Sequence, residues 1–120
     1  MSNELLTVDE SEIPETGSRI VRLRGLEVGI FRVGGKYYAI RNECIHQRGP
    51  VCEGRVTGAL YARADGHHLK FEWTKEGEIL VCPWHGLEFD IRTGASLAMK
   101  KGRLRTYPLR VEKGKIILEA

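Results

Sequence analysis

Several features of membrane, secreted and nucleic-acid-binding proteins are missing from this sequence. No apolar run approaches the roughly 20 residues that a membrane-spanning helix needs. The N-terminal stretch has neither the basic start nor the apolar segment of a secretory signal. No segment combines dense lysine and arginine with interleaved aromatic residues. We therefore expect no secretory signal, no membrane anchor and no nucleic-acid ligand, while the formal net charge of +3 is compatible with an acidic protein partner.

Cysteine is also scarce, since the 120 residues include only three, Cys44, Cys52 and Cys82. If Cys44 and Cys82 bind a metal, Cys52 is left alone, and no intrachain disulfide can form without removing a ligand. A reducing, cytoplasmic setting is therefore expected. The length suits a single domain, residues 1–120, with one core.

Helical periodicity is almost absent, because apolar residues alternate in short runs that turn residues interrupt. Residues 9–16 have room for one helical turn, and residues 42–56 are expected to form a constrained loop. Turns are expected at Gly34-Gly35, Asp65-Gly66, Glu76-Gly77, Thr93-Gly94 and Lys113-Gly114. The pattern predicts an all-β fold of antiparallel strands, expected at residues 21–24, 26–33, 37–41, 60–64, 69–73, 79–81, 87–91, 107–112 and 116–118.

Two short stretches each place one cysteine and one histidine within the reach of a single loop. The first is Cys44-Ile45-His46, and the second is Cys82-Pro83-Trp84-His85-Gly86. Both adjoin expected strands, so a sheet would hold four ligands on two hairpin tips. The side chains of the two cysteines and the two histidines are therefore the candidate metal ligands.

Zinc and iron are both candidates for this ligand set. Structural zinc also takes two cysteines and two histidines, but it usually pairs like ligands on one element. Here each loop supplies one ligand of each type. That division favours a two-iron cluster in which one iron takes both thiolates and the other takes both imidazoles.

With Gln47-Arg48-Gly49-Pro50 after the first stretch and Phe89-Asp90 after the second, the two stretches resemble the ligand boxes of Rieske [2Fe–2S] domains. The likeness covers nearly the whole chain. It implies a Rieske-like antiparallel β sandwich or barrel whose cluster-binding subdomain, at about residues 42–95, carries two ligand hairpin loops.

The same resemblance implies the cofactor and its ligands. The cofactor would be one Rieske-type [2Fe–2S] cluster. Cys44 and Cys82 would hold one iron, and His46 and His85 would hold the other, more exposed iron.

Two departures indicate a branch within the family. Rieske proteins of respiratory complexes link their two loops by a disulfide, whose cysteines would fall at Gly49 and Trp84 of this chain. They also place a serine hydroxyl donor where this chain has Leu87. Fewer hydrogen bonds to the cluster sulfurs lower the reduction potential. We therefore expect a potential in the lower part of the Rieske range of about −150 to +300 mV.

The segment between the two boxes is long, with 35 residues between His46 and Cys82, which is roughly double the common spacing of the family. We interpret the surplus, Thr57 to Ile79, as an added hairpin. The proline that many members carry in a third loop near the cluster has no counterpart in residues 94–105. The basic run Lys100-Lys101-Gly102-Arg103 in that region is expected to be a solvated turn.

Other notable residues have structural interpretations. Cys52 is expected to be a small buried hydrophobe beneath the first loop, with a redox sensor or stray ligand as the alternative. Asp90 is expected to cap the turn at Thr93-Gly94. His67 and His68 are expected on the surface of the added hairpin or half-buried in one of its strands.

The resemblance implies an electron carrier and not an enzyme. Rieske oxygenases carry a second, mononuclear iron in a longer catalytic domain, for which 120 residues leave no room. The leading interpretation is a soluble Rieske-type ferredoxin that carries single electrons from a flavin-dependent reductase to a terminal oxygenase. The alternatives are a small Rieske subunit of a multi-component oxidoreductase, similar to that of nitrite reductase, and a structural zinc-binding module.

Overall fold

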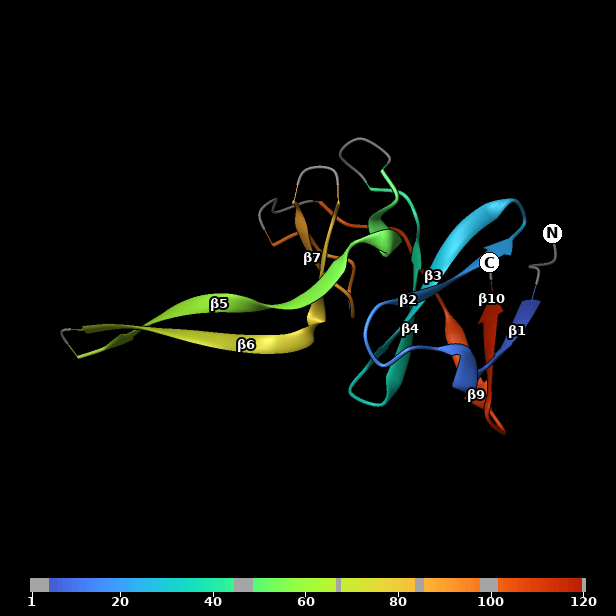
Figure 1. The fold of residues 1–120 in the computed structure, drawn as a ribbon, viewed down its shortest axis with the longest axis horizontal. Coiled ribbons are helices and arrows are strands. Elements are labelled where there is room, and N and C mark those ends of the chain that lie inside the picture. The colour runs from blue at the N-terminus through green and yellow to red at the C-terminus, as the bar shows by residue number, and fades with distance from the viewer. Residues whose placement is uncertain (1–4, 45–48, 67, 84–85, 98–101, 120) are drawn as a thin grey trace.

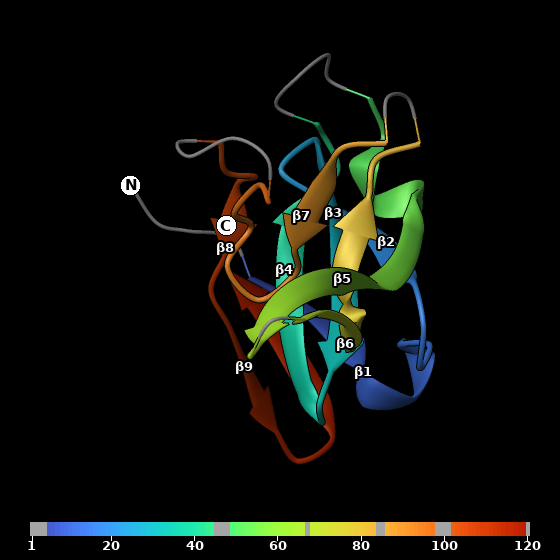
Figure 2. The same ribbon diagram turned by 90° about the vertical axis from the view of Figure 1, so that its left-hand side faces the viewer.

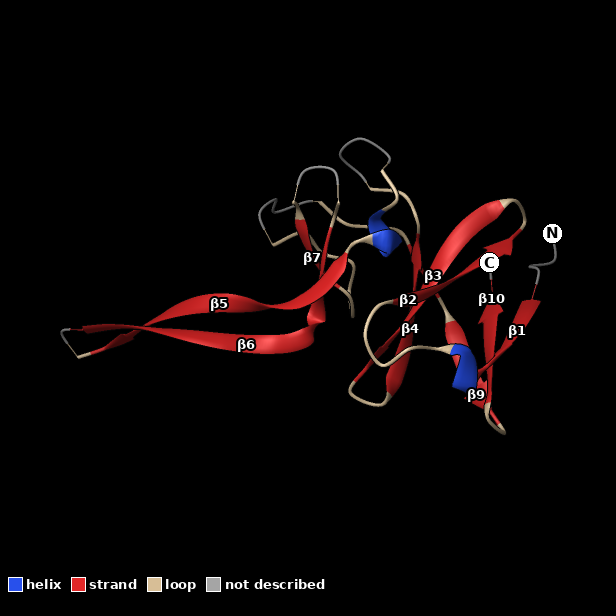
Figure 3. Cartoon of the chain, viewed as in Figure 1, coloured by secondary structure: helices blue, strands red, loops and turns tan. Residues whose placement is uncertain are grey.

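The computed structural model describes residues 5–44, 49–66, 68–83, 86–97 and 102–119, and within 59–65 and 68–76 it describes the backbone. Almost all regular structure in these residues is strand, with two short 3-10 helices (Figure 3), so the all-β prediction is confirmed. The elements are β1 (Leu5–Asp9), η1 (Glu10–Glu12), β2 (Ser18–Leu23), β3 (Leu26–Val33), β4 (Lys36–Arg41), η2 (Val51–Glu53), β5 (Arg55–Asp65), β6 (His68–Val81), β7 (Glu88–Asp90), β8 (Thr106–Tyr107), β9 (Leu109–Glu112) and β10 (Lys115–Glu119).

The strands form three antiparallel sheets. Their strand orders are β1-β10-β9, β2-β3-β4-β8 and β5-β6-β7. Figures 1 and 2 show the sheet of β2, β3 and β4 between the other two, with the long β5–β6 hairpin extending away from the body. The residues that the structure describes contain no helix that is long and apolar enough to cross a membrane.

Strand β3 contributes side chains to the cores on both sides of the middle sheet. Val28 and Ile30 pack in two neighbouring clusters that each include a residue of β10, whereas Phe31 and Val33 pack in the cluster that includes residues of β6 and β7. Successive side chains of a strand point to opposite faces. A strand that is covered on both faces has a nearly continuous apolar run, as the segment 26–33 has.

Two of the expected tight turns join neighbouring strands with positive φ at both central positions. Gly34 and Gly35 have φ of 59° and 80° between β3 and β4, and Lys113 and Gly114 have φ of 50° and 77° between β9 and β10. This geometry matches the right-handed twist of the flanking strands. Both turn predictions are confirmed.

The turn expected at Glu76-Gly77 is absent, and that prediction is wrong. These residues lie inside β6, where Thr57 pairs with Ile79 but Ala59 pairs with Thr74. The register advances by two residues on β5 and by five on β6, so β6 bulges. Gly77 has φ of 81° there. A bulge and a tight turn both need glycine's positive φ, which is why the sequence pattern suggested a turn.

The prediction of a single strand at 107–112 is also wrong, because the chain changes sheets at Pro108. β8 pairs with β4 in the middle sheet, whereas β9 pairs with β10 in the outer sheet. Proline has no N–H to continue a strand ladder. Strand β1 was not expected from the sequence, and it pairs with β10 at the other end of the chain, Leu5 opposite Glu119.

The added hairpin predicted at Thr57–Ile79 is confirmed as the β5–β6 hairpin. The molecule measures 56 × 33 × 23 Å, with a radius of gyration of 15.6 Å. A compact domain of this length would have a radius of gyration of about 14 Å. The hairpin therefore makes the molecule elongated (Figure 1).

We predict that the body folds without the outer hairpin. Replacing residues 58–78 by a two-residue Asn-Gly turn joins Thr57 to Ile79, which already pair with each other. The buried clusters draw no described residue from the removed segment. The radius of gyration measured by small-angle X-ray scattering should fall to about 13 Å. The midpoint of thermal unfolding should change by less than about 5 °C.

The full-length chain under identical conditions is the control. A large loss of thermal stability in the shortened chain would contradict the prediction, because it would mean that the hairpin stabilises the body.

Candidate metal centre

Each of the two cysteine–histidine stretches is closed at its base by the same kind of backbone hydrogen bond. The N–H of Cys44 donates to the carbonyl of Gly49 at 2.8 Å, and the N–H of Cys82 donates to the carbonyl of Leu87 at 2.8 Å. Both bonds join a cysteine to the residue five positions later. In the second loop, Gly86 has φ of 69° and donates its N–H to the carbonyl of Cys82 at 3.0 Å. The two loops are therefore closed in the same way.

Strands hold both loops at their ends. β4 leads toward Cys44, and just beyond the strand the N–H of Asn42 donates to the carbonyl of Glu27 at 2.8 Å. The second loop joins β6 to β7, whose register pairs Val81 with Glu88. A site built on strand ends is positioned more rigidly than one on long free loops.

The two cysteines are free, buried and part of one apolar cluster. Cys44 is 2% exposed and Cys82 is 1% exposed, and their cluster includes Leu80, Phe89 and Leu104. Among the described residues, no charged or polar side chain is fully buried. Thiolates are the soft ligands that iron–sulfur clusters use. The structure therefore brings the two predicted cysteine ligands into one core.

His46 and His85, the predicted imidazole ligands, lie outside the described residues, as do Arg48, Trp84 and His67. Within the described residues, no group of three or more histidine, cysteine, aspartate or glutamate side chains could hold a metal ion. The role of the two histidines as ligands therefore stays a prediction.

Gly54 lies directly against the end of β6. A Cβ at this position would lie 1.9 Å from the carbonyl oxygen of Val81 and 3.0 Å from that of Val51. Val81 immediately precedes Cys82, so this close approach packs the chain that follows the first loop against the base of the second. Only glycine fits here without moving backbone.

Cys52, the third cysteine, is a buried residue with every polar group bonded. It is 2% exposed, and its thiol donates to the carbonyl of Ile40 at 3.2 Å. Its N–H donates to Oδ1 of Asn42 at 2.8 Å, and its carbonyl accepts from the hydroxyl of Ser18 at 2.7 Å. Burial raises the pKa of the thiol to about 12. The prediction of a small buried hydrophobe is confirmed.

Asp90 stabilises the turn after β7, as the sequence predicted. Its Oδ1 accepts from the N–H of Arg92 at 2.8 Å, and its carbonyl accepts from the N–H of Gly94 at 2.7 Å. Gly94 has φ of 79°, and a Cβ there would lie 2.7 Å from the carbonyl oxygen of Leu104. The turn therefore packs against the segment that follows residue 101.

Leu104 is a core residue that the sequence reasoning missed. It is 1% exposed, lies in the same cluster as Cys44, and its N–H donates to the carbonyl of Gly94 at 2.7 Å. The neighbouring Arg103 and Arg105 are exposed. This alternation of exposed, buried and exposed residues is the signal that could have identified it.

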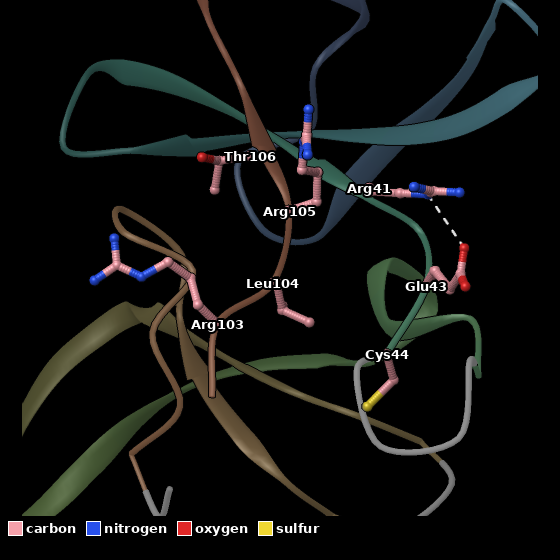
Figure 4. Close-up of a pocket in the computed structure, with 7 residues that line it drawn as sticks. All are labelled: Arg41, Glu43, Cys44, Arg103, Leu104, Arg105 and Thr106. Carbon is pink, nitrogen blue, oxygen red and sulfur yellow. Dashed lines mark ion pairs between the residues drawn. The ribbon is translucent and has the colours of Figure 1, made fainter. Parts of the chain in front are cut away.

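A hollow of about 430 Å³ opens next to Cys44. Leu104 lines it together with Arg41, Arg103 and Arg105, as Figure 4 shows. The three arginines come from two segments far apart in the sequence, which a backbone hydrogen bond from the N–H of Arg41 to the carbonyl of Arg105 joins at 2.9 Å.

Comparison with known families now identifies this arrangement. The model described as "Rieske [2Fe-2S] domain" matches residues 3–108. This chain belongs to the Rieske [2Fe–2S] domain family. Its cofactor is a Rieske-type [2Fe–2S] cluster, and the Rieske fold that the sequence predicted is confirmed.

Two curated relatives of this Rieske protein are ferredoxin components of oxygenase systems. One belongs to the naphthalene 1,2-dioxygenase/salicylate 5-hydroxylase systems of Ralstonia sp. and is 27% identical over 109 residues, covering 90% of this chain and 86% of the relative. The other is the 3-phenylpropionate/cinnamic acid dioxygenase ferredoxin subunit of Escherichia coli (strain K12). It is 31% identical over 93 residues, covering 77% of this chain and 71% of the relative.

Solved structures share the fold. The ferredoxin of carbazole 1,9a-dioxygenase from Nocardioides aromaticivorans IC177 has a TM-score of 0.72 at 23% identity, covering 98% of this chain and 97% of that one. A protein of Mycobacterium tuberculosis assigned as the small subunit of an NADH-dependent nitrite reductase has a TM-score of 0.70 at 18% identity, covering 98% and 96%. At these identities, the likeness concerns the fold alone.

The described residues fit the cysteine half of a Rieske cluster. Two free thiols lie in one apolar core, and both loops carry the same closing hydrogen bond. In a Rieske cluster, one iron takes two cysteine thiolates. The thiol of Cys52 donates to a carbonyl of β4 and is occupied by that contact.

We predict that Gly54→Ala destabilises the protein by at least about 3 kcal/mol, because a Cβ 1.9 Å from the carbonyl oxygen of Val81 forces backbone to move. Urea unfolding measures the loss of free energy. The matched control is Gly25→Ala, where a Cβ meets nothing within 4 Å and only the φ of 76° opposes alanine. Its loss should be about 1–2 kcal/mol. Equal losses in the two variants would contradict the steric argument.

We predict that Cys52 makes stability depend on alkaline pH. The thiol's pKa is raised from 9.0 to about 12 in the folded protein, so its stabilising contribution is fully present below pH 9. It is lost progressively as the pH rises toward 12, because the unfolded thiol ionises first. Between pH 8 and pH 10.5, the free energy of unfolding measured in urea should fall by about 2 kcal/mol more for the unmodified protein than for Cys52→Ala.

Cys52→Ala is itself the control for all other titrating groups. Parallel stability profiles for the two proteins across this pH range would show that the thiol does not titrate differently in the folded and unfolded states.

Proposed function

We propose that this protein is a Rieske-type ferredoxin, an electron carrier without a catalytic site of its own. The observation that carries the proposal is the pair of loops with the same closing hydrogen bond, each placing a buried cysteine in one core. Membership of the Rieske [2Fe–2S] domain family supports it, as do relatives that are ferredoxin components of dioxygenase systems. When bound, the cluster supplies reversible one-electron chemistry.

In this proposal, Cys44 and Cys82 hold one iron of the cluster, and His46 and His85 hold the other. The burial of both cysteines supports the first pair. The position of each histidine in the sequence, between a cysteine and the residue that closes its loop, supports the second. The whole chain, residues 1–120, acts as one domain whose cluster-binding part spans about residues 42–95.

The cluster is proposed to have a low potential for a Rieske centre. Leu87 closes the second loop through its backbone carbonyl and has no hydroxyl to donate to a cluster sulfur. Gly49 closes the first loop, so no disulfide can join the two loops there. Fewer donors to the sulfurs leave more negative charge on the cluster and make reduction harder.

The proposed partners are a flavin-dependent reductase as electron donor and a terminal oxygenase as acceptor, in the cytoplasm. The names of the two curated relatives, which are components of dioxygenase systems, support the acceptor. A second candidate is a small subunit of a nitrite-reductase-like oxidoreductase, which the shared fold of the Mycobacterium tuberculosis protein supports. The presence of all four candidate ligands favours the ferredoxin.

The proposed function predicts a red-brown protein with one reversible one-electron reduction and a rhombic EPR signal in the reduced state. Its midpoint should lie between about −150 and +100 mV in a redox titration. Catalytic amounts should increase electron flow from NADH through a dioxygenase reductase to cytochrome c by at least about tenfold, because a small one-electron carrier can shuttle between the two proteins.

Cys44→Ala and Cys82→Ala should abolish the EPR signal and the electron flow. Cys52→Ala is the matched control and should keep both, because its thiol faces the carbonyl of Ile40. A midpoint above about +100 mV would contradict the low potential. A colourless protein that carries zinc would contradict the carrier function and support the zinc-binding module.

A further inference from the structure

The hollow next to Cys44 has a basic rim. Arg41, Arg103 and Arg105 line it, together with one acidic residue, Glu43 (Figure 4). Nε of Arg41 lies 3.1 Å from Oε2 of Glu43. Three guanidinium groups against one carboxylate leave the rim positively charged, since arginine stays protonated at any physiological pH.

Two of these arginines are available to a partner. Arg103 and Arg105 are exposed. Within the described part of the chain, neither has a carboxylate within ion-pairing distance, and Arg105 lies over the ring of Tyr107 at 5.8 Å. Arginines without a carboxylate partner keep their capacity for bidentate hydrogen bonds to carboxylates.

Backbone contacts hold the rim in place. Arg103 forms a β-bridge with Ala95, and the carbonyl of Arg105 accepts from the N–H of Arg41 at 2.9 Å. Between them, the buried Leu104 anchors the segment in the core that also contains Cys44. Because the backbone is already fixed, only the arginine side chains have to lose freedom when a partner binds.

We propose that the arginine rim, formed by Arg41, Arg103 and Arg105, is the docking surface for an acidic face of a redox protein partner. This inference rests on the proposed function and adds where, and through which chemistry, one partner binds. A partner at the rim would lie over the hollow that Cys44 lines, close to a proposed cluster ligand. Opposite charges on the two proteins also speed their encounter at low salt.

The directions of the three side chains favour a protein surface over a small anion. In Figure 4, the guanidinium groups of Arg41, Arg103 and Arg105 point away from one another around the hollow. They do not converge on a single point, as ligands of one phosphate or sulfate would. Separate carboxylates spread over a protein face can meet each of them.

The test is the rate at which a reduced plant-type [2Fe–2S] ferredoxin, a strongly reducing acidic protein, reduces the oxidised holoprotein in a stopped-flow spectrometer. In the double variant Arg103→Glu/Arg105→Glu, the second-order rate constant at about 10 mM ionic strength should fall by at least about tenfold. The difference should disappear in about 0.5 M NaCl, where charges more than a few ångströms apart are screened.

The matched control is Lys36→Glu/Lys113→Glu, which changes the net charge equally. Both lysines are exposed and lie at the β3–β4 and β9–β10 turns, outside the hollow. Its rate constant should fall by less than about threefold. Equal falls in the two double variants, or no fall in either, would overturn the proposal, since net charge alone would then explain the rates.

Sodium sulfate and sodium chloride are compared at equal ionic strength. Selective inhibition by sulfate would indicate a small-anion site and would overturn the proposal. The EPR signal of each reduced variant is recorded first, so that absence of the cluster, which contradicts the proposed function, is separated from failed docking. If the double variant loses its cluster, the exposed single variant Arg103→Gln replaces it, with a fall of at least about twofold expected.

Discussion

Apolar packing between the middle sheet and strands β6 and β7 is the interaction on which the cluster site depends. Phe31 and Ile40 from the middle sheet share one core with Leu80 and Phe89 from β6 and β7, and both Cys44 and Cys82 belong to that core. The thiols are therefore positioned by the same contacts that hold the two sheets together. Loosening this packing would therefore displace the two thiols relative to each other.

The β5–β6 hairpin shows how a long addition can leave such a site intact. β6 is continuous from the hairpin into the base of the second loop, but its bulge lies between the outer hairpin and the residues that pair with β7. Leu80 pairs with Phe89 on the side of the bulge that leads into the second loop. None of the described side chains of the extra residues belongs to the buried clusters, and the hairpin extends the molecule away from its body (Figure 1).

The sequence predicts those elements of the fold that neighbouring residues determine. The segment 26–33 is predicted correctly because its apolar run and the following Gly34-Gly35 are local signals. β1 is not predicted because it forms by pairing with β10, whose residues lie at the other end of the chain. At Gly77 the pattern predicts a turn where the strand bulges, because both structures need positive φ.

The candidate site also has one part that the sequence predicts and one part that it does not. The cysteine and histidine stretches can be found from spacing alone, and the burial of Cys44 and Cys82 agrees with the roles predicted for them. The arginine rim cannot be found from spacing, because Arg41 lies far from Arg103 and Arg105 in the sequence. A hydrogen bond between the two segments, which no pattern in the sequence indicates, brings them together.

The burial of Cys52 has a consequence for how the cluster is assembled. Iron is bound by thiolates, and burial raises the pKa of the Cys52 thiol to about 12, so this thiol stays protonated at neutral pH. The residue's N–H, carbonyl and thiol are all bonded within the protein, so the contacts that bury Cys52 also keep it from acting as a third thiolate ligand.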